Sequence, residues 1–319
     1  MAKQGRDQIK LEVLSVLDCS DNLVNEILRL KKEKNAIILA HNYQIGEVQD
    51  IADFVGDSLG LSQQASDTDA EVIVFCGVHF MAETAAILSP QKMVLLPDID
   101  AGCPMADMVT VDKLRELKAE HPGVPVVTYV NSSAEVKAES DYCCTSANAI
   151  KVVNAVDADE IIFTPDQHLG HYVSTQTTKK LILWNGFCPT HRRITAQSVT
   201  ARKEAHPNAK IVVHPECMEE VIALADAVGS TEGILRYVKA SSDTEFIIGT
   251  EMGIIHRLEK ENPGKIFYTG SERSVCPNMK RITLEKVLWS LQDMEYVITV
   301  PEDIAALAKR AIDRMLEIV

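Results

Sequence analysis

Short apolar runs alternate with amphipathic segments along most of this chain. The runs are continuously apolar rather than alternating, which is typical of strands in a parallel sheet covered on both faces. They lie at residues 36–40, 72–75, 93–96, 124–128, 160–163, 181–184, 210–213, 246–248 and 266–268. Helical patterns at 111–120, 148–156, 196–205 and 231–239 separate them. This order of elements predicts an α/β protein.

The two ends of the chain carry helical patterns outside this alternation. A lead-in helix is predicted over 11–34, and two helices are predicted over 284–291 and 304–318. We expect the C-terminal pair to pack back on the body of the protein.

Polar groups recur at a constant spacing just after the predicted strands. His41-Asn42-Tyr43, Tyr129-Val130-Asn131 and His214-Pro215-Glu216 begin 88 (129 − 41) and 85 (214 − 129) residues apart. Ser58, Ser146 and Thr231 repeat with the same two intervals. Equal spacing over a domain-sized interval indicates an internal repeat. We therefore expect three αβα units related by a pseudo-threefold axis, with short parallel sheets, at residues 1–108, 109–194 and 195–319.

Three cysteines share this period, and each precedes a proline. They are Cys103, Cys188 and Cys276, separated by 85 (188 − 103) and 88 (276 − 188) residues. A structural zinc site needs four ligands, commonly in close pairs, and three-cysteine catalytic zinc is unusual. Cysteine thiolates also hold iron–sulfur clusters, and a cubane with three ligands leaves one iron open as a Lewis acid. This pattern favours a central cluster bound by one cysteine from each unit.

Composition excludes some classes of protein. The 319 residues carry a formal net charge of −14, which argues against nucleic acid or an anionic membrane surface as a partner. The sequence shows neither a secretory signal nor a run of about 20 apolar residues. We expect a cytoplasmic protein, in which the eight cysteines are thiols or metal ligands rather than structural disulfides.

The polar groups around the predicted cluster favour catalysis over electron transfer. Ligands bind outside the carboxyl ends of strands in open parallel sheets, so these groups should share one pocket. Glu216 is a candidate general base, Tyr43 and Tyr129 are candidate proton donors or orienting groups, and His41 is a further candidate catalytic residue. The periodic hydroxyl residues Ser58, Ser146 and Ser230-Thr231 can cap helices. At Ser230 and Thr231 they can also bind phosphate at a helix N-terminus. The residues expected in the pocket are His41, Tyr43, Ser58, Tyr129, Asn131, Ser146, His214, Glu216, Ser230 and Thr231.

These motifs together resemble the quinolinate synthase family. The resemblance spans residues 36–279 and rests on HNY at 41–43, GDS at 56–58, GCP at 102–104, YVN at 129–131, GFCP at 186–189, HPE at 214–216, GST at 229–231 and CP at 276–277. It implies a pseudo-threefold fold around a [4Fe–4S] cluster. It also implies condensation of iminoaspartate with dihydroxyacetone phosphate to quinolinate, a precursor of NAD.

The resemblance further implies a role for each residue. Cys103, Cys188 and Cys276 would ligate the cluster. The dicarboxylate would be held by His41, Ser58, Tyr129, Asn131 and Ser146. His214, Ser230 and Thr231 would hold the triose phosphate, while Glu216 and Tyr43 would move protons. An L-aspartate oxidase or aspartate dehydrogenase would supply iminoaspartate.

Two other functions stay open at this point, and one family feature is missing. A different iron–sulfur hydro-lyase would act on a single hydroxy acid, and a cluster-based sensor would need a DNA-binding element that the sequence lacks. Some family members carry a redox-sensitive CxxC beside the third ligand. Here Arg273 and Met279 occupy those places, so we expect no disulfide at Cys276.

Overall fold

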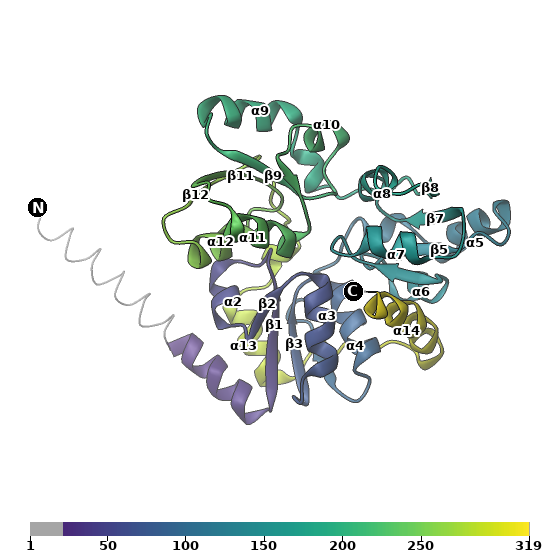
Figure 1. Cartoon of the computed structure of the whole chain (residues 1–319). Coiled ribbons are helices and arrows are strands. Elements are labelled where there is room, and N and C mark those ends of the chain that lie inside the picture. Colours follow the sequence, from purple (N-terminus) through teal and green to yellow (C-terminus); the bar gives the residue numbers. More distant parts are fainter. Residues whose placement is uncertain (1–21, 319) are drawn as a thin grey trace, which may run out of the picture.

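A computed structural model describes residues 22–318 (Figure 1). Within this range the strands form three separate four-stranded sheets, and all the pairings between named strands are parallel. Each sheet has the same order, in which the second strand lies at one edge and the first and third strands are central. The predicted α/β class and threefold repetition are confirmed.

The observed strands begin and end within two residues of the predicted runs, and each unit adds one edge strand. The first sheet contains β1 (Ala36–His41), β2 (Phe54–Gly56), β3 (Val72–Cys76) and β4 (Met93–Leu95). The second contains β5 (Val126–Tyr129), β6 (Tyr142–Cys144), β7 (Glu160–Thr164) and β8 (Lys180–Leu183). The third contains β9 (Lys210–Val213), β10 (Ala227–Val228), β11 (Glu245–Gly249) and β12 (Ile266–Thr269).

An aspartate beside each edge strand explains how these short strands are held. Its carboxylate accepts the backbone N–H of a residue at the neighbouring central strand, at 2.8 Å in all three units. The pairs are Asp53 with Ile38, Asp141 with Val126, and Asp226 with Ile211. The aspartates stand 88 and 85 residues apart (141 − 53; 226 − 141), so this contact repeats with the period of the motifs.

Helices and single 3₁₀ turns connect the strands. In the first unit these are α2 (Gly46–Ile51), α3 (Ser58–Asp67), α4 (His79–Leu88) and η1 (Ala106–Met108). The second has α5 (Val111–Glu120), α6 (Ala134–Ala138), α7 (Ala149–Ala155), α8 (Gln167–Ser174) and η2 (His191–Arg193). The third has α9 (Ala196–Ala205), α10 (Glu219–Ile222), α11 (Thr231–Ala240), α12 (Ile254–Glu261) and η3 (Met279–Arg281), followed by α13 (Leu284–Asp293) and α14 (Glu302–Glu317).

Helices lie at both ends of the described range. Residues 22–33 are helical, whereas residues 11–21 of the predicted lead-in helix lie outside the described range. Helix α14 packs against α4 and α6, joining the first and second units (Figure 1). It buries Ala308, Ala311, Ile312 and Met315, and the Asn148 side chain donates to the Met315 carbonyl at 3.2 Å. The predicted packing of this helix against the body is confirmed.

The third sheet is packed by hydrophobic clusters of its own. One large cluster of buried side chains runs through the first sheet, much of the second and both C-terminal helices. The third sheet is instead covered by two separate clusters, one built around Val199 and Val213 and the other around Phe246 and Leu258. No helix among residues 22–318 combines the length and apolar content that crossing a membrane requires.

Candidate functional site

One cavity of about 160 Å³ collects residues from all three units at the carboxyl ends of their strands. This is the edge where parallel sheets place their ligand sites. The predicted site residues that line it are His41, Tyr43, Ser58, Cys103, Tyr129, Asn131, Ser146, Cys188, His214, Glu216, Thr231 and Cys276. Ser230 is buried and precedes the lining residue Thr231, but it does not itself line the cavity.

The periodic hydroxyl residues differ in role: Ser230 caps a helix, whereas Ser58 and Ser146 do not. Ser230 caps α11, because its hydroxyl accepts the N–H of Gly233 at 3.2 Å. In the first unit the cap of α3 is Asp57, not Ser58, and Asp57 accepts the N–H of Gly60 at 3.0 Å. Ser146 likewise does not cap α7, whose N-cap position is Asn148. Ser58 and Ser146 therefore do not cap these helices, and both line the cavity.

The three periodic cysteines occupy equivalent loops. Each follows the fourth strand of its unit and leads into a 3₁₀ turn, and each is a half-buried free thiol. Burial raises the pKa of Cys103 to about 12, and the neighbouring Cys276 adds to this shift. Burial and nearby acidic groups, Cys103 among them, also raise the pKa of Cys188. The thiolate forms of these cysteines repel one another across the cavity. A bound cationic group would neutralise their negative charges and so favour the thiolates.

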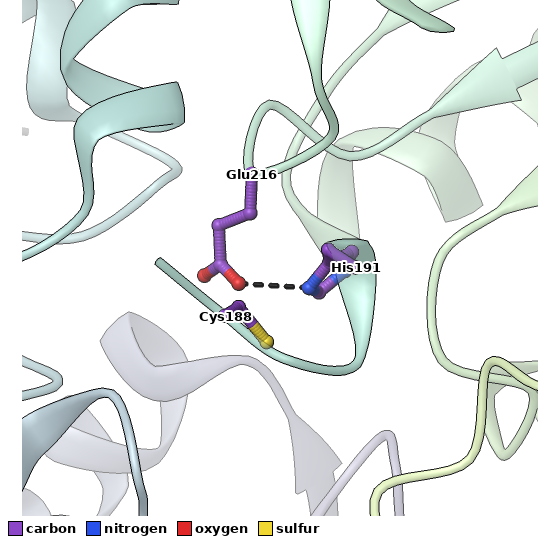
Figure 2. A group of neighbouring side chains, drawn as sticks. All are labelled: Cys188, His191 and Glu216. Carbon is purple, nitrogen blue, oxygen red and sulfur yellow. Dashed lines mark ion pairs between the residues drawn. The ribbon is translucent and has the colours of Figure 1, made fainter. Parts of the chain in front are cut away.

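A second possible metal-binding group overlaps this triad at Cys188. One ligand atom each from Cys188, His191 and Glu216 lies within 4.8 Å of the other two (Figure 2). Figure 2 shows the three side chains pointing toward one another from the cysteine loop and from the loop after β9. The imidazole and carboxylate of this group already form a close ion-pair contact, at 2.8 Å from His191 Nδ1 to Glu216 Oε2.

Glu216 lies in a chain of polar side chains joined by hydrogen bonds and by its ion-pair contact with His191. Its Oε1 accepts the Tyr129 hydroxyl at 2.6 Å, and its Oε2 faces His191 Nδ1. On the far side of the imidazole, Nε2 lies 2.8 Å from the Thr250 hydroxyl. That hydroxyl in turn lies 2.5 Å from the Tyr43 hydroxyl. The chain therefore joins the two tyrosines through a threonine, a histidine and a carboxylate.

The carboxylate fixes the direction of its own two contacts. Because a carboxylate only accepts, the Tyr129 hydroxyl and His191 Nδ1 each direct a proton toward Glu216. Burial raises the pKa of Tyr43 and of Tyr129, and the charge of Glu216 raises both further, so the phenols stay protonated. Both groups that contact the carboxylate therefore point donors toward it.

Glu216 itself stays ionised. Burial favours its neutral form, but the adjacent His191 imidazole and the hydrogen bond from Tyr129 outweigh this effect and hold its pKa below the usual range. Since Glu216 is 3% exposed, water does not screen its charge. The ionised carboxylate is in the protonation state that a general base requires.

Two histidines sit in the same type of turn and remain neutral. The N–H of Tyr43 donates to His41 Nδ1 at 3.2 Å, and the N–H of Glu216 donates to His214 Nδ1 at 3.3 Å. Burial lowers the pKa of each histidine to about 3. In these neutral rings the proton is consequently on Nε2, which makes each ring a donor; His214 Nε2 lies 3.1 Å from the Ser146 hydroxyl.

Sequence reasoning missed His191 and Thr250, although the repeat contains a signal for both. His191 follows its cysteine by three residues, where the other units have Ala106 and Met279. Thr250 directly follows β11, where the other units have Gly77 and Pro165. At each of these two equivalent positions, only one of the three units has a side chain with a nitrogen or oxygen atom that can form hydrogen bonds.

Comparisons with known proteins agree over nearly the whole chain. A family model described as "Quinolinate synthetase A protein" matches residues 25–317. The protein "Quinolinate synthase 1" of Methanosarcina acetivorans is 58% identical over 297 residues, which cover 93% of this chain and 98% of the relative. "Quinolinate synthase" of Geobacter metallireducens is 59% identical over 299 residues, covering 94% and 98%. The matched range contains all three cysteine loops.

Proposed function

Because this chain belongs to the quinolinate synthetase A family, we propose that it is a quinolinate synthase of NAD biosynthesis. It condenses iminoaspartate with dihydroxyacetone phosphate and releases quinolinate, one phosphate and two waters. The observation that carries the proposal is the meeting of three equivalent cysteine loops and the Glu216 hydrogen-bonded chain on one cavity.

The cofactor proposed for this cavity is a [4Fe–4S] cluster held by Cys103, Cys188 and Cys276. When bound through three thiolates, such a cluster has one open iron that supplies Lewis-acid chemistry toward a hydroxyl or carboxylate oxygen. Support comes from the donor set, which is three cysteines from loops of the same kind. His191 and Glu216 are already engaged with each other, which favours the three cysteines as the ligand set over the overlapping group at Cys188.

We assign the polar residues that line or flank the cavity to two groups, one for each substrate. His41, Ser58, Asn131 and Ser146 would hold the carboxylates of iminoaspartate, with Tyr129 beside them. The neutral His41 ring offers an Nε2–H donor, and Ser58 offers a hydroxyl not used for capping. His214, Ser230 and Thr231 would hold the triose phosphate at the start of α11, where backbone N–H groups and the helix dipole favour an anion.

Glu216 would act as the general base, and Tyr43 and Tyr129 as proton donors. Glu216 accepts a proton from a substrate carbon, and the buried phenols give protons to departing oxygen atoms. His191 and Thr250 connect Tyr43 with the carboxylate, so that a proton lost at one end can be replaced from the other. The enzyme would work in the cytoplasm, with iminoaspartate from an L-aspartate oxidase or an aspartate dehydrogenase.

The test is an anaerobic reconstitution with iron and sulfide, followed by an assay for quinolinate. The loaded wild-type protein should hold about four irons per chain and form quinolinate from dihydroxyacetone phosphate and freshly generated iminoaspartate. Cys188→Ala should lose both the iron and the activity. A loaded wild-type protein that forms no quinolinate would refute the proposed reaction, and full iron content in Cys188→Ala would refute the ligand assignment.

A further inference from the structure

Each cysteine loop is tied to its own sheet by the same backbone hydrogen bond. The donor is the third residue after the third strand of the unit, and the acceptor is the carbonyl two residues before the cysteine. The three bonds run from His79 to Ala101 at 2.8 Å, from Gln167 to Gly186 at 2.8 Å, and from Met252 to Ser274 at 3.0 Å. The donors lie 88 and 85 residues apart (167 − 79; 252 − 167), so the bond belongs to the repeat.

The residue just before each donor distinguishes the units. In the second unit it is Asp166, whose Oδ2 accepts the N–H of Cys188 at 3.1 Å. In the third unit it is Glu251, whose Oε1 accepts the N–H of Cys276 at 3.0 Å. The first unit has Val78 at this place, which offers no acceptor. Two of the three candidate ligand cysteines thus have their amides bonded to a carboxylate.

Both carboxylates are completely buried, with 0% exposure. Their remaining oxygens are also used. Asp166 Oδ1 accepts two N–H groups of α8 at 2.8 Å, and Glu251 Oε2 accepts the N–H of Gly253 at 2.7 Å and lies 3.1 Å from Lys280 Nζ. Burial raises the pKa of both groups, yet every oxygen of each accepts an N–H, which is the pattern of an ionised carboxylate. A buried carboxylate is unfavourable unless its oxygens have such partners, and the cysteine amides supply one of them in each case.

The turn itself does not need a carboxylate. In the first unit α4 begins after Val78 without a side-chain cap, and the backbone bond from His79 to Ala101 forms as in the other units. The backbone bond between this segment and the cysteine loop therefore forms with and without the acidic residue. Besides their bonds at the start of the following helix, Asp166 and Glu251 add a directional bond to the amide of a cysteine, which restricts the backbone on which the thiol is carried.

We propose that Asp166 and Glu251 are positioning residues, which hold Cys188 and Cys276 so that their thiols face the cavity in a geometry ready for an iron–sulfur group. The proposal rests on the proposed function for the identity of that group. Cys103 has no such support from its own unit; the Asn278 side chain instead donates to the carbonyl of the preceding Gly102 at 2.8 Å.

The test compares Asp166→Asn and Glu251→Gln in the metal-free protein, where it does not depend on catalysis. An amide keeps only one acceptor oxygen, and the two contacts at Oδ1 or Oε2 favour its placement there, which leaves an N–H₂ facing the cysteine amide. Loss of this hydrogen bond should make the affected loop open about tenfold more often. The rate of alkylation by iodoacetamide, followed for each cysteine by peptide mass spectrometry, should rise at Cys188 alone in the first variant and at Cys276 alone in the second.

A matched control separates positioning from general destabilisation. Asp141 also accepts one backbone N–H, from Val126 in the second unit, but its partner belongs to the sheet and not to a cysteine loop. Asp141→Asn should lower the melting temperature and leave all three alkylation rates unchanged. After anaerobic loading, Asp166→Asn and Glu251→Gln should release iron to a chelator several-fold faster than Asp141→Asn does.

The outcomes distinguish this proposal from the proposed function. Unchanged or uniformly increased alkylation in Asp166→Asn and Glu251→Gln would overturn the positioning role, as would equally fast iron release from Asp141→Asn. If the wild-type protein binds no iron, the cofactor proposal fails, yet the site-specific alkylation still decides whether the carboxylates fix the loops. If Asp166→Asn does not fold, Glu251→Gln, in which Lys280 retains the backbone carbonyl of Tyr43 as a partner, provides the same test at Cys276.

Discussion

Replacing Glu216 with glutamine is the most direct test of the hydrogen-bonded chain. The new amide would keep one oxygen that can accept the Tyr129 hydroxyl, which lies 2.6 Å from Oε1 of the native carboxylate. On its other side it would present an N–H₂ group to His191 Nδ1, which lies 2.8 Å from Oε2 of the native carboxylate. An N–H₂ group cannot accept the proton that Nδ1 directs toward the carboxylate, so the pairing with the imidazole is lost. The change removes the proposed base and breaks the chain at His191.

The size of the effect follows from these losses. A general acid–base residue contributes about 10²- to 10⁴-fold to turnover. At about 1.4 kcal/mol for each factor of ten, this raises the barrier by about 3 to 5 kcal/mol. Among the described residues no hydrogen bond joins the Glu216 carboxylate to a cysteine thiol, so iron content should stay near the wild-type value. We expect a kcat at least about 100-fold lower in a protein that still binds its cluster.

The assay is quinolinate formation under anaerobic conditions, normalised to bound iron. Glu83→Gln is a matched control, because Glu83 is also buried and accepts a backbone N–H, from Ala134 at 3.1 Å, but does not line the cavity. Tyr129→Phe and the double variant with Glu216→Gln complete a cycle. Since the two groups share one hydrogen bond, the double variant should be little worse than Glu216→Gln alone. A turnover of Glu216→Gln within a few-fold of wild type would refute the catalytic role.

Two further predictions concern acid stability and oxidation. Burial disfavours the Asp98 charge, but donors from Lys286 and Arg281 outweigh this and lower its pKa below the usual range. A lowered folded-state pKa means that this carboxylate stabilises the fold at neutral pH and that the stabilisation is lost as pH falls through the folded pKa. Asp98→Asn should therefore reduce the free energy of unfolding by about 1 to 2 kcal/mol at pH 7, and chemical denaturation should show this difference vanishing as the pH falls through the lowered folded-state pKa of Asp98. After mild oxidation of the metal-free protein, peptide mass spectrometry should find no disulfide that contains Cys276; finding one would refute the prediction made from Arg273 and Met279.

The place of the site could be predicted from the sequence because two simple rules combine. Parallel strands bring their carboxyl ends to one edge of a sheet, and an internal repeat places equivalent ends around a common axis. The positions of His41, Tyr129 and His214 at the ends of β1, β5 and β9 follow from these rules alone. The cysteines follow in the same way, since each lies in the loop after the fourth strand of its unit.

Other features depend on tertiary contacts that leave a weaker mark in the sequence. The edge strands β2, β6 and β10 contain two or three residues each, too few for an apolar run to stand out. They are held by a neighbouring aspartate that bonds to the adjacent strand, as Asp53 does with Ile38. His191 was missed because a lone histidine beside a cysteine has many ordinary explanations. Only its distance to Glu216 distinguishes it.

The repeat predicts where a group lies but not what it does, because the units differ at equivalent places. The third residue of the motif after the first strand is Tyr43 in one unit, Asn131 in the next and Glu216 in the third. In the order of the chain these are a phenol, an amide and a carboxylate facing one cavity. The third unit also supplies Thr250, and its sheet is packed by separate hydrophobic clusters. A threefold scaffold can therefore bring three thiols together symmetrically while the polar groups beside them are asymmetric, since Glu216 and the hydroxyl that connects it through His191 to Tyr43 come from one unit alone.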